Sequence, residues 1–298
     1  MKDNILLAGA TGNLGGKIAD MLISKKANVI AIVRKETNHT KIENLTKKGI
    51  KVLQIDMTNS DEIAKACRDV NCVISAFSGL RETIVDSQKL LLDAVVKAGV
   101  SRFIPSDYSS DFTNLVPGKN RNLDLRREFH TYLDTKPIKA TTIFNGPFMD
   151  LLTTDMPLIL FKKKKILCWG NPDIKMDFTS TYNVAEYTAN VALDNSSPRY
   201  LKIAGDTMSA NDIKNLMSEL SGTKYKLFRP GGIGLLNSII GVAKFFDRSK
   251  TELYPAWQGM QYMRDMMEGR AVITNHDNDR YLMKWTKIKE YLVSENVK

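Results

Sequence analysis

The fold of this chain is decided by the stretch Ile5-Leu6-Leu7-Ala8-Gly9-Ala10-Thr11-Gly12-Asn13-Leu14-Gly15-Gly16. An apolar run leads into glycines, and Ile18, Met21 and Leu22 then follow at helical spacing. This order predicts a buried strand, a tight turn and an amphipathic helix.

Three glycines in this stretch have the spacing of a dinucleotide-binding turn. Gly9 permits the tight turn, Gly12 lets a pyrophosphate approach the backbone, and Gly15 lets the helix pack close to the sheet. The helix N-terminus adds free N–H groups and a partial positive charge. The alternative is an ordinary glycine turn between a strand and a helix. We expect the cofactor to be bound here by Gly9, Thr11, Gly12, Asn13, Leu14 and Gly15.

The end of the second expected strand indicates which dinucleotide is bound. An acid about 20 residues after the glycines usually binds the ribose 2′-hydroxyl of NAD, but this chain has Arg34 and Lys35 after the strand 28–33. Two cations suit a 2′-phosphate, and arginine can bind it through two hydrogen bonds. We therefore expect NADP rather than NAD, the alternative being ordinary surface cations at a strand end.

The next two strands end in further candidate cofactor contacts. Asp56 and Met57 close the strand 51–58, and we expect the pair to line the adenine. Asp56 could instead cap the following helix, but Ser60 or Asp61 is better placed for that. The strand 72–79 ends in small residues, and we expect Ala76, Phe77 and Ser78 to lie beside the nicotinamide ribose.

Strands alternate with helices along the first half of the chain, which predicts parallel pairing with right-handed crossovers. Further strands are expected at 101–108 and 140–148, and 200–204 is expected to return to the same sheet. We predict an α/β fold with a doubly wound parallel sheet in residues 1–150 and a smaller α+β lobe in 151–298. Ligands of such sheets bind at the carboxyl ends of the strands.

Composition narrows the remaining classes of protein. The chain has 298 residues, a net charge of +10 and three cysteines without metal-ligand spacing. The run Lys162-Lys163-Lys164-Lys165 is interpreted as a solvated connection between two buried segments. The other cations are scattered and the apolar runs are far too short to span a bilayer. We expect a reduced, cytoplasmic setting, no metal, and no nucleic-acid or membrane partner.

Three motifs together resemble the NmrA-like and isoflavone reductase-like atypical short-chain dehydrogenases. They are Gly9-Ala-Thr-Gly12-Asn-Leu-Gly15, Val100-Ser-Arg-Phe103-Ile-Pro105-Ser106-Asp107-Tyr108 and Asn145-Gly146-Pro-Phe148. The resemblance covers essentially the whole chain. It implies a Rossmann-type domain, NAD(P) binding, and a small C-terminal lobe over the nicotinamide, with Asn145 on the cofactor and Phe148 on the substrate.

The resemblance also implies a catalytic lysine on the helix before the strand 140–148. Arg126, Arg127 or Glu128 falls near that place, and no lysine does. An arginine holds its proton too firmly to act as a general acid, although it can bind an oxyanion or a phosphate. The pair Tyr132 and Lys136 has the usual short-chain dehydrogenase spacing, but we reject it because it lies at the far end of its helix.

Other candidates for chemistry lie close by in the sequence. His130 shares a helix face with Arg126 and titrates in a useful range, although a satisfied surface histidine is the more common case. Asp107 and Tyr108 leave the fifth strand and could contact the nicotinamide pocket, or Asp107 could bond the nearby backbone of its turn. The catalytic candidates are therefore Asp107, Arg126 and His130.

The second lobe offers a candidate substrate wall. Residues 254–267 carry several aromatic and methionine side chains, which suit either an adaptable pocket or a plain core helix. They are Trp257, Met260, Tyr262, Met263, Met266 and Met267. We expect Tyr108, Phe148 and Trp257 on the substrate side. Two functions remain open: a reductase moving hydride from NADPH to a small carbonyl, quinone or enone, and a non-catalytic redox sensor that regulates a protein partner. An oligomer is compatible with both.

Overall fold

The structure, a computed structural model, describes residues 3–154, 158–249 and 251–296. Its contacts divide the chain into two compact units. Unit 1 consists of Met1–Tyr108, Leu125–Ile143 and Val184–Leu201, and unit 2 consists of Ser109–Asp124, Phe144–Asn183 and Lys202–Lys298. Each unit is therefore assembled from segments that are far apart in the sequence.

Unit 1 contains a six-stranded sheet in the order β3-β2-β1-β4-β5-β6. All five strand pairs are parallel. The strands are β1 (Asn4–Ala8), β2 (Asn28–Arg34), β3 (Lys51–Ile55), β4 (Cys72–Ser75), β5 (Arg102–Ile104) and β6 (Lys139–Ala140). This order is that of a doubly wound dinucleotide-binding sheet, so the predicted fold class is confirmed.

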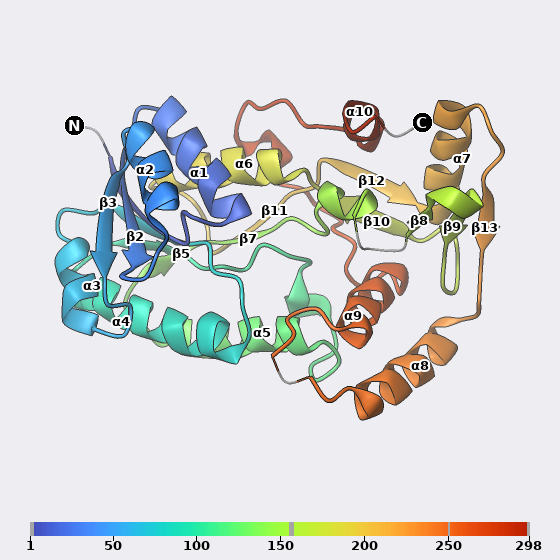
Figure 1. Cartoon of the computed structure of the whole chain (residues 1–298), viewed down its shortest axis with the longest axis horizontal. Coiled ribbons are helices and arrows are strands. Elements are labelled where there is room, and N and C mark those ends of the chain that lie inside the picture. Colours follow the sequence, from blue (N-terminus) through green and yellow to red (C-terminus); the bar gives the residue numbers. More distant parts are fainter. Residues whose placement is uncertain (1–2, 155–157, 250, 297–298) are drawn as a thin grey trace. The chain divides into compact units, whose positions relative to one another are not determined.

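Helices cover both faces of this sheet. Figure 1 shows α1 and α6 on one side and α3, α4 and α5 on the other. The helices are α1 (Asn13–Ser24), α2 (His39–Lys47), α3 (Ser60–Ala66), α4 (Gln88–Lys97), α5 (Arg121–Leu133) and α6 (Thr181–Leu193). A π-helical turn, η1 (Glu82–Ser87), precedes α4 where the sequence predicts one continuous helix.

Two strand predictions need correction. The strand expected over 140–148 is two short strands, because β6 pairs with β5 whereas β7 (Thr142–Phe144) pairs with β11 (Tyr200–Lys202). For the same reason 200–204 does not return to the main sheet. The pairing of β6 with β5 ends where Ala140 pairs with Phe103, and β7 keeps one parallel bridge to the chain after β5, between Phe144 and Ser109.

The core of unit 1 lies between the sheet and α3, α4 and α5. Phe103 on β5 and Phe129 on α5 are fully buried in it, with ring centroids 6.4 Å apart. Leu91, Leu92 and Val95 face the same core from α4 because they recur at helical spacing. Burial on both faces explains why the strands carry continuous apolar runs.

Unit 2 is built from two small sheets and helices. A three-stranded sheet has the order β13-β9-β8, and an antiparallel pair joins β10 to β12. Its strands are β8 (Ile159–Leu160), β9 (Lys165–Leu167), β10 (Lys175–Phe178), β12 (Asp206–Ser209) and β13 (Lys226–Phe228), and its helices are α7 (Ala210–Ser221), α8 (Ile233–Phe246), α9 (Ala256–Met267) and α10 (Ile288–Ser294). Four short 3-10 turns complete the units: η2 (Phe112–Asn114), η3 (Met149–Leu152), η4 (Phe161–Lys163) and η5 (Asn278–Arg280).

Two features of unit 2 are encoded by short stretches of sequence. The Ser209 hydroxyl accepts from the Asp212 amide, the Asp212 carboxylate accepts from the Ser209 amide, and Gly222 ends α7 in the left-handed region. The lysine run lies in the connection between β8 and β9, with Lys162–Lys164 exposed. Both features depend on neighbouring residues alone, which is why the sequence predicts them.

Close backbone packing fixes the turn between β1 and α1. A Cβ on Gly15 would fall inside contact distance of the Gly9 carbonyl oxygen, so α1 touches the turn at this point. Gly9 has φ +93°, and a Cβ there would lie 2.5 Å from the carbonyl oxygen of Ala76, just after β4. Neither position accepts a side chain without moving backbone.

Gly15 and its neighbour Gly16 give a matched pair for testing this packing. We expect Gly15→Ala to lower the free energy of unfolding by about 1–3 kcal/mol, because the new methyl group displaces the turn. Gly16→Ala places its methyl group 3.6 Å from the Ala10 carbonyl oxygen, an ordinary contact, and should stabilise α1 by up to about 1 kcal/mol. Urea unfolding measures both, and equal stabilities of the two variants would contradict the expectation.

Candidate functional site

The N-terminus of α1 is open to an anion. Gly12 is its N-cap, none of the described side chains caps its first turn, and that turn carries no acid. The Gly12 amide donates to the Gly9 carbonyl at 3.0 Å, which fixes the curve of the turn. Together the uncapped N–H groups and the helix dipole form a cradle that suits a pyrophosphate.

The two cations expected to select the cofactor differ in their surroundings. Arg34 is the last residue of β2, and its exposed side chain has no hydrogen bond or ion pair in the described part of the chain. Lys35 lies 3.5 Å from a carboxylate oxygen of Glu62. Arg34 is therefore the cation whose guanidinium is available to a ligand, whereas Lys35 already has a partner.

Asp56 lies at the end of β3 and does not cap α3. The Asn59 side chain accepts from the amides of Asp61 and Glu62, so the expectation that Ser60 or Asp61 caps this helix was wrong. Asp56 Oδ1 accepts from the hydroxyl and the amide of Thr58, and these hydrogen bonds lower the pKa of its carboxyl. Met57 is half-buried and packs against the core of unit 1.

Hydrogen bonds link the residues that follow β4 to those that follow β5. The Ser106 hydroxyl donates to the Phe77 carbonyl at 2.6 Å, and the Ser106 amide donates to the side-chain oxygen of Gln88 at 3.0 Å. Gln88 is fully buried and also donates to the Ile84 carbonyl. These contacts fix the path of the chain at the carboxyl edge of the sheet, where ligands of such folds bind.

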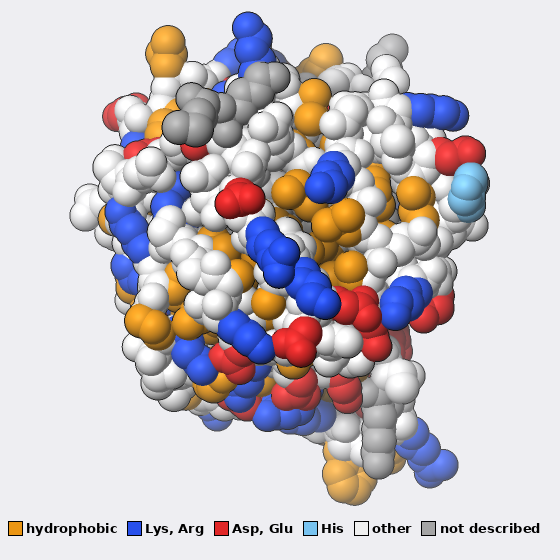
Figure 2. All heavy atoms as spheres, turned by 90° about the vertical axis from the view of Figure 1, so that its left-hand side faces the viewer, with side chains coloured by type: hydrophobic (Ala, Val, Ile, Leu, Met, Phe, Trp, Pro, Cys, Tyr) orange, Lys and Arg blue, Asp and Glu red, His pale blue; other side chains and the backbone are white. Residues whose placement is uncertain are grey.

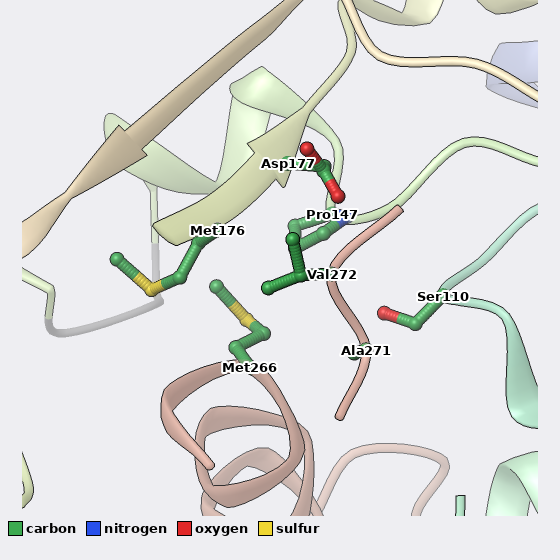
Figure 3. A pocket seen from close by; sticks show the side chains of 7 residues that line it. All are labelled: Ser110, Pro147, Met176, Asp177, Met266, Ala271 and Val272. Atoms are coloured by element: carbon green, nitrogen blue, oxygen red, sulfur yellow. The ribbon is translucent and has the colours of Figure 1, made fainter. Parts of the chain in front are cut away.

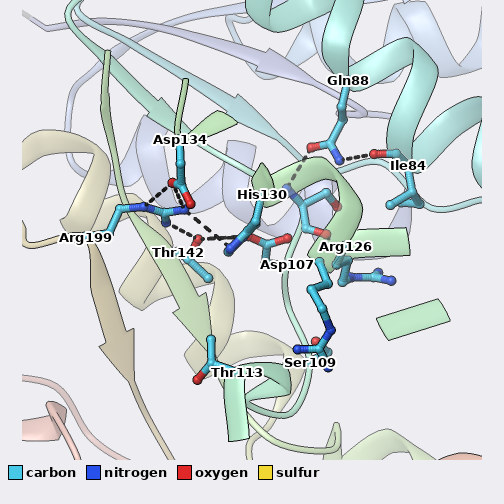
Figure 4. A network of polar contacts seen from close by, with 12 residues as sticks. Ile84, Gln88, Asp107, Ser109, Thr113, Arg126, His130, Asp134, Thr142 and Arg199 are labelled. Atoms are coloured by element: carbon cyan, nitrogen blue, oxygen red, sulfur yellow. Dashed lines mark hydrogen bonds and ion pairs between the residues drawn. The ribbon is translucent and has the colours of Figure 1, made fainter. Parts of the chain in front are cut away.

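A buried network of charges follows directly after Ser106 (Figure 4). One oxygen of Asp107 lies 2.5 Å from His130 Nε2 and accepts from the Thr142 hydroxyl at 2.8 Å. Arg199 donates to the same hydroxyl and to Asp134, which extends the network towards the surface. The carboxyl of Asp107 is fully buried, so its charge depends on these partners.

Two alternatives from the sequence are settled by this network. His130 is 6% exposed, so it is not a surface histidine, and Asp107 does more than stabilise its own turn. Burial opposes ionisation of Asp107, but the charge and hydrogen bond of His130, with the charge of Arg126, outweigh it and lower the pKa of the carboxyl. The pair is therefore an ionised carboxylate held against an imidazole.

Arg126 lies one helical turn before His130 on α5. Its Nε donates to the Ser106 carbonyl at 3.1 Å, and the side chain is half-buried. Figure 4 shows Arg126 beside Asp107, and its charge helps to lower the pKa of that carboxyl. The guanidinium is thus anchored at the exit of β5, near the position where the resemblance implies a lysine.

The pair Tyr132 and Lys136 has a structural explanation. The Tyr132 hydroxyl donates to Asp93, and Lys136 forms an ion pair with the same carboxylate at 2.6 Å. Hydrogen bonding of Lys136 to the Asp93 carboxylate and to Tyr132 raises the pKa of its ammonium group. Their placement is consistent with rejecting the pair.

The remaining expected contacts are distributed over both units. In unit 1, Tyr108 is buried, and burial raises the pKa of its phenol. In unit 2, Asn145 is fully buried, and its side-chain amide donates to the Gly146 carbonyl. Phe148 is half-buried, and its backbone forms an isolated β-bridge with Thr179. Ala76 and Phe77 are half-buried and Ser78 is exposed at the exit of β4.

Helix α9 is a core helix of unit 2. Met263, Met266 and Met267 are buried in the unit 2 core, and the Trp257 indole donates to Asp247 at 2.6 Å while its ring packs under Arg121. A cavity of about 10 Å³ lies beside Met266 (Figure 3), lined by Ser110, Pro147, Met176, Asp177, Met266, Ala271 and Val272. Its volume is that of a single water site, so this cavity is too small for a substrate.

Charge on the molecular surface is mixed. On the face seen in Figure 2, Lys and Arg alternate with Asp, Glu and hydrophobic side chains rather than forming a continuous band. Across the described ranges, no helix is long and apolar enough to cross a bilayer. In those same ranges no cluster of His, Cys, Asp and Glu is arranged to hold a metal.

Three side chains that contact Ser106 or belong to the buried network were not found from the sequence. Gln88, Thr142 and Arg199 are each far from Asp107 along the chain, and nothing in their own neighbourhoods marks them. Arg199 reaches Thr142 because β11 begins at Tyr200 and pairs with β7. The mispredicted strand partner therefore concealed this contact.

Comparisons with known proteins agree with this architecture. Residues 1–292 match the model of the NmrA-like family. The probable pinoresinol-lariciresinol reductase 3 of Arabidopsis thaliana is 28% identical over 232 residues, which are 72% of each chain. A crystal structure of isoflavone reductase has a TM-score of 0.85 at 18% identity and covers 99% of this chain and 100% of its own.

A further structure of similar fold is the NADPH-dependent quinone oxidoreductase QOR2 of Escherichia coli. It has a TM-score of 0.78 at 18% identity and covers 98% of this chain and 99% of its own. Both structural likenesses show a shared fold. Because the family model spans nearly the whole sequence, this chain belongs to the NmrA-like family.

Proposed function

We propose that this protein binds NADP(H) and reduces a small carbonyl, quinone or enone with NADPH. The observation that carries the proposal is the open N-terminus of α1 together with Arg34, which ends the strand paired with β1 and whose guanidinium has no partner among the described residues. QOR2 is an NADPH-dependent quinone oxidoreductase, and the Arabidopsis relative is a probable reductase. Family membership therefore supports reductive chemistry with this cofactor.

The residues present fit the dinucleotide. The turn Gly9–Gly15 leaves room for a pyrophosphate because Gly12 has no Cβ, and the nearest atom to one built there is the Gly9 carbonyl oxygen at 3.4 Å. In the proposed site Thr11, Asn13 and Leu14 complete the phosphate cradle, Arg34 and Lys35 bind the 2′-phosphate, Asp56 and Met57 line the adenine, and Ala76, Phe77, Ser78 and Asn145 lie along the nicotinamide ribose.

The reductive step needs a stabiliser of negative charge on the substrate oxygen. NADPH, when bound, supplies a hydride to the substrate carbon, and a proton from water completes the reduction to the alcohol or hydroquinone. Arg126 is the proposed oxyanion donor, because its guanidinium stays charged and is anchored on Ser106. It binds charge and does not transfer a proton.

Asp107 and His130 are proposed as positioning residues. The ionised carboxylate attracts the guanidinium of Arg126, and His130 keeps that carboxylate ionised in a buried place. On the substrate side, Phe148 is proposed as the direct contact because it is half-buried, whereas Tyr108 and Trp257 are buried and shape the surrounding packing.

A redox sensor is the second candidate, and the arginine at position 126 is the observation that favours it. Without a lysine near this point of α5, binding of NADP(H) could be separated from turnover. The discriminating experiment follows NADPH oxidation by absorbance with a panel of quinones, enones and aldehydes. Turnover with any of them supports the reductase, whereas tight NADPH binding without turnover supports the sensor.

Arg34→Ala tests the choice of cofactor. We expect its affinity for NADPH to fall about tenfold or more, because charge-assisted hydrogen bonds to the 2′-phosphate are lost, while its affinity for NADH stays unchanged. Isothermal titration calorimetry at fixed ionic strength measures both. Lys41→Ala removes another exposed cation of unit 1 and is the control. A parallel loss for NADPH and NADH would contradict the assignment of Arg34.

Arg126→Met tests the oxyanion donor. We expect kcat to fall about a hundredfold, the usual cost of losing such a donor, with NADPH affinity unchanged. Arg126→Lys keeps the positive charge and should therefore retain most of the wild-type kcat. Arg68→Met, at an exposed position of the same unit, should behave like the wild type. Full activity of the methionine variant would exclude Arg126 from the reaction.

Asp107→Asn tests the buried pair through pH. Because the pKa of Asp107 is lowered on folding, its carboxylate stabilises the folded state above the ordinary value of 3.8, and this contribution is lost as the pH falls below it. At neutral pH we expect the variant to be less stable by about 3–5 kcal/mol. Urea unfolding across acidic pH should show the difference narrowing below pH 3.8, and a pH-independent difference would contradict the pairing.

A further inference from the structure

Two lysine-rich segments of unit 2 lie side by side. In the parallel register of β9 and β13, Lys165 pairs with Lys226, and the Lys226 amide donates to the Lys164 carbonyl at 3.1 Å. Lys165 is half-buried, and the other lysines of the two segments are exposed. We call the six side chains the lysine patch: Lys162, Lys163, Lys164, Lys165, Lys224 and Lys226.

The segments that carry the lysine patch contain no acid. Residues 158–172 and 220–246 have neither Asp nor Glu. Helix α7 packs against β9 and β13, and both of its acids already have cationic partners. Asp212 pairs with Lys175 at 2.5 Å, and Glu219 pairs with Lys289 at 2.7 Å. The positive charge of the patch is therefore not neutralised by these elements.

The lysines of the patch also lack polar partners of their own. In the described part of the chain, none of the exposed members forms an ion pair or a side-chain hydrogen bond. The ammonium group of Lys165 lies 5.4 Å from the ring centroid of Phe228. Lys165 and Lys226 are cross-strand neighbours, and like charges in such positions destabilise a sheet. A bound polyanion would offset this repulsion.

Arg229, directly after β13, is not part of the patch. Its guanidinium donates to the Gly170 carbonyl at 2.6 Å, so it is already engaged within unit 2. The charge that remains available to a partner is that of the lysines alone.

β13 is an end strand of its sheet, whose order is β13-β9-β8 (Figure 1). The Lys226 amide donates to the Lys164 carbonyl, and the Phe228 carbonyl accepts from the Cys168 amide at 2.9 Å. Because hydrogen-bonding direction alternates along a strand, the amide and carbonyl of Leu227 point away from β9. The described residues place no other strand on that side. An extended peptide can pair with an edge of this kind.

We propose that the lysine patch and the outer edge of β13 bind an acidic, extended segment of another protein. Its backbone pairs with Leu227, and its acidic side chains reach Lys224 and Lys226, which lie two positions apart and therefore on one face of the strand. The lysines between β8 and β9 extend the positive field beyond the edge. The contact is independent of the proposed reductase function.

Other occupants fit these observations less well. A second copy of this chain would bring one lysine patch against another, and like charges oppose such an interface. Nucleic acids and lipid headgroups match the charge, but they cannot form a strand ladder with the Leu227 amide and carbonyl. Only a polypeptide uses both the charge and the open edge.

Fluorescence anisotropy of the full chain, without cofactor, tests the charge. The probe is a labelled heptapeptide of alternating glutamate and valine. We expect saturable binding that weakens as salt is raised. Lys226→Glu should weaken the affinity about tenfold, because an attraction at the edge becomes a repulsion. Lys119→Glu is the matched control, since it changes the net charge equally at an exposed position of unit 2 outside the patch, and it should bind like the wild type.

A modified probe tests the edge without changing the protein. The same heptapeptide with alternate amides N-methylated keeps its charge but cannot form a strand ladder, so we expect it to bind about tenfold more weakly. Equal binding of the two peptides would overturn the pairing with β13.

The remaining outcomes also decide the proposal. Thermal unfolding should show that both lysine variants remain folded. Absence of peptide binding, or equal losses in Lys226→Glu and Lys119→Glu, would overturn the assignment of the patch. Tighter binding of oligothymidylate or of phosphatidylglycerol vesicles than of the peptide would overturn the choice of an acidic polypeptide.

Discussion

The close approach of Gly15 to the Gly9 carbonyl is the contact on which the rest of unit 1 depends. It sets the start of α1 against the end of β1, so the uncapped N–H groups lie at the carboxyl edge of the sheet. Because Gly9 has no Cβ, the turn also lies directly against the backbone of Ala76, just after β4. The exits of β1 and β4 therefore touch through backbone alone, which leaves the edge free of side chains where a phosphate would bind.

Beyond β4, the loops at the carboxyl edge of the sheet are held in place by polar contacts rather than by apolar packing. Ser106 ties the exit of β5 to Phe77, and Asp107 begins the buried network that ends at Arg199. A buried carboxylate is expensive unless it is paired, and paired burial contributes little net stability. A network of this kind is better understood as a means of fixing geometry, and in the proposed function the side chain that it helps to position is Arg126.

The sequence predicts most of what is locally encoded. The first four strands, the glycine turn and the lysine connection all depend on residues within a few positions of one another. The pairing of β7 with β11 depends on where Arg199 and Tyr200 lie, almost sixty residues further on. No local sequence pattern predicts it. The burial of His130 was missed for the same reason, because Asp107 and Thr142 approach it from two other elements. Pattern analysis thus named Asp107 and His130 as candidates but did not predict that they pair.

The same limit explains why α8 differs from the other helices. Its apolar residues exceed what one buried face requires, and a sequence pattern alone cannot tell two buried faces from one buried and one exposed. The structure separates them, since Leu236 and Ile240 reach the core while Phe245 and Phe246 do not. Mutation of the buried pair would act through stability, because both side chains pack in the unit 2 core.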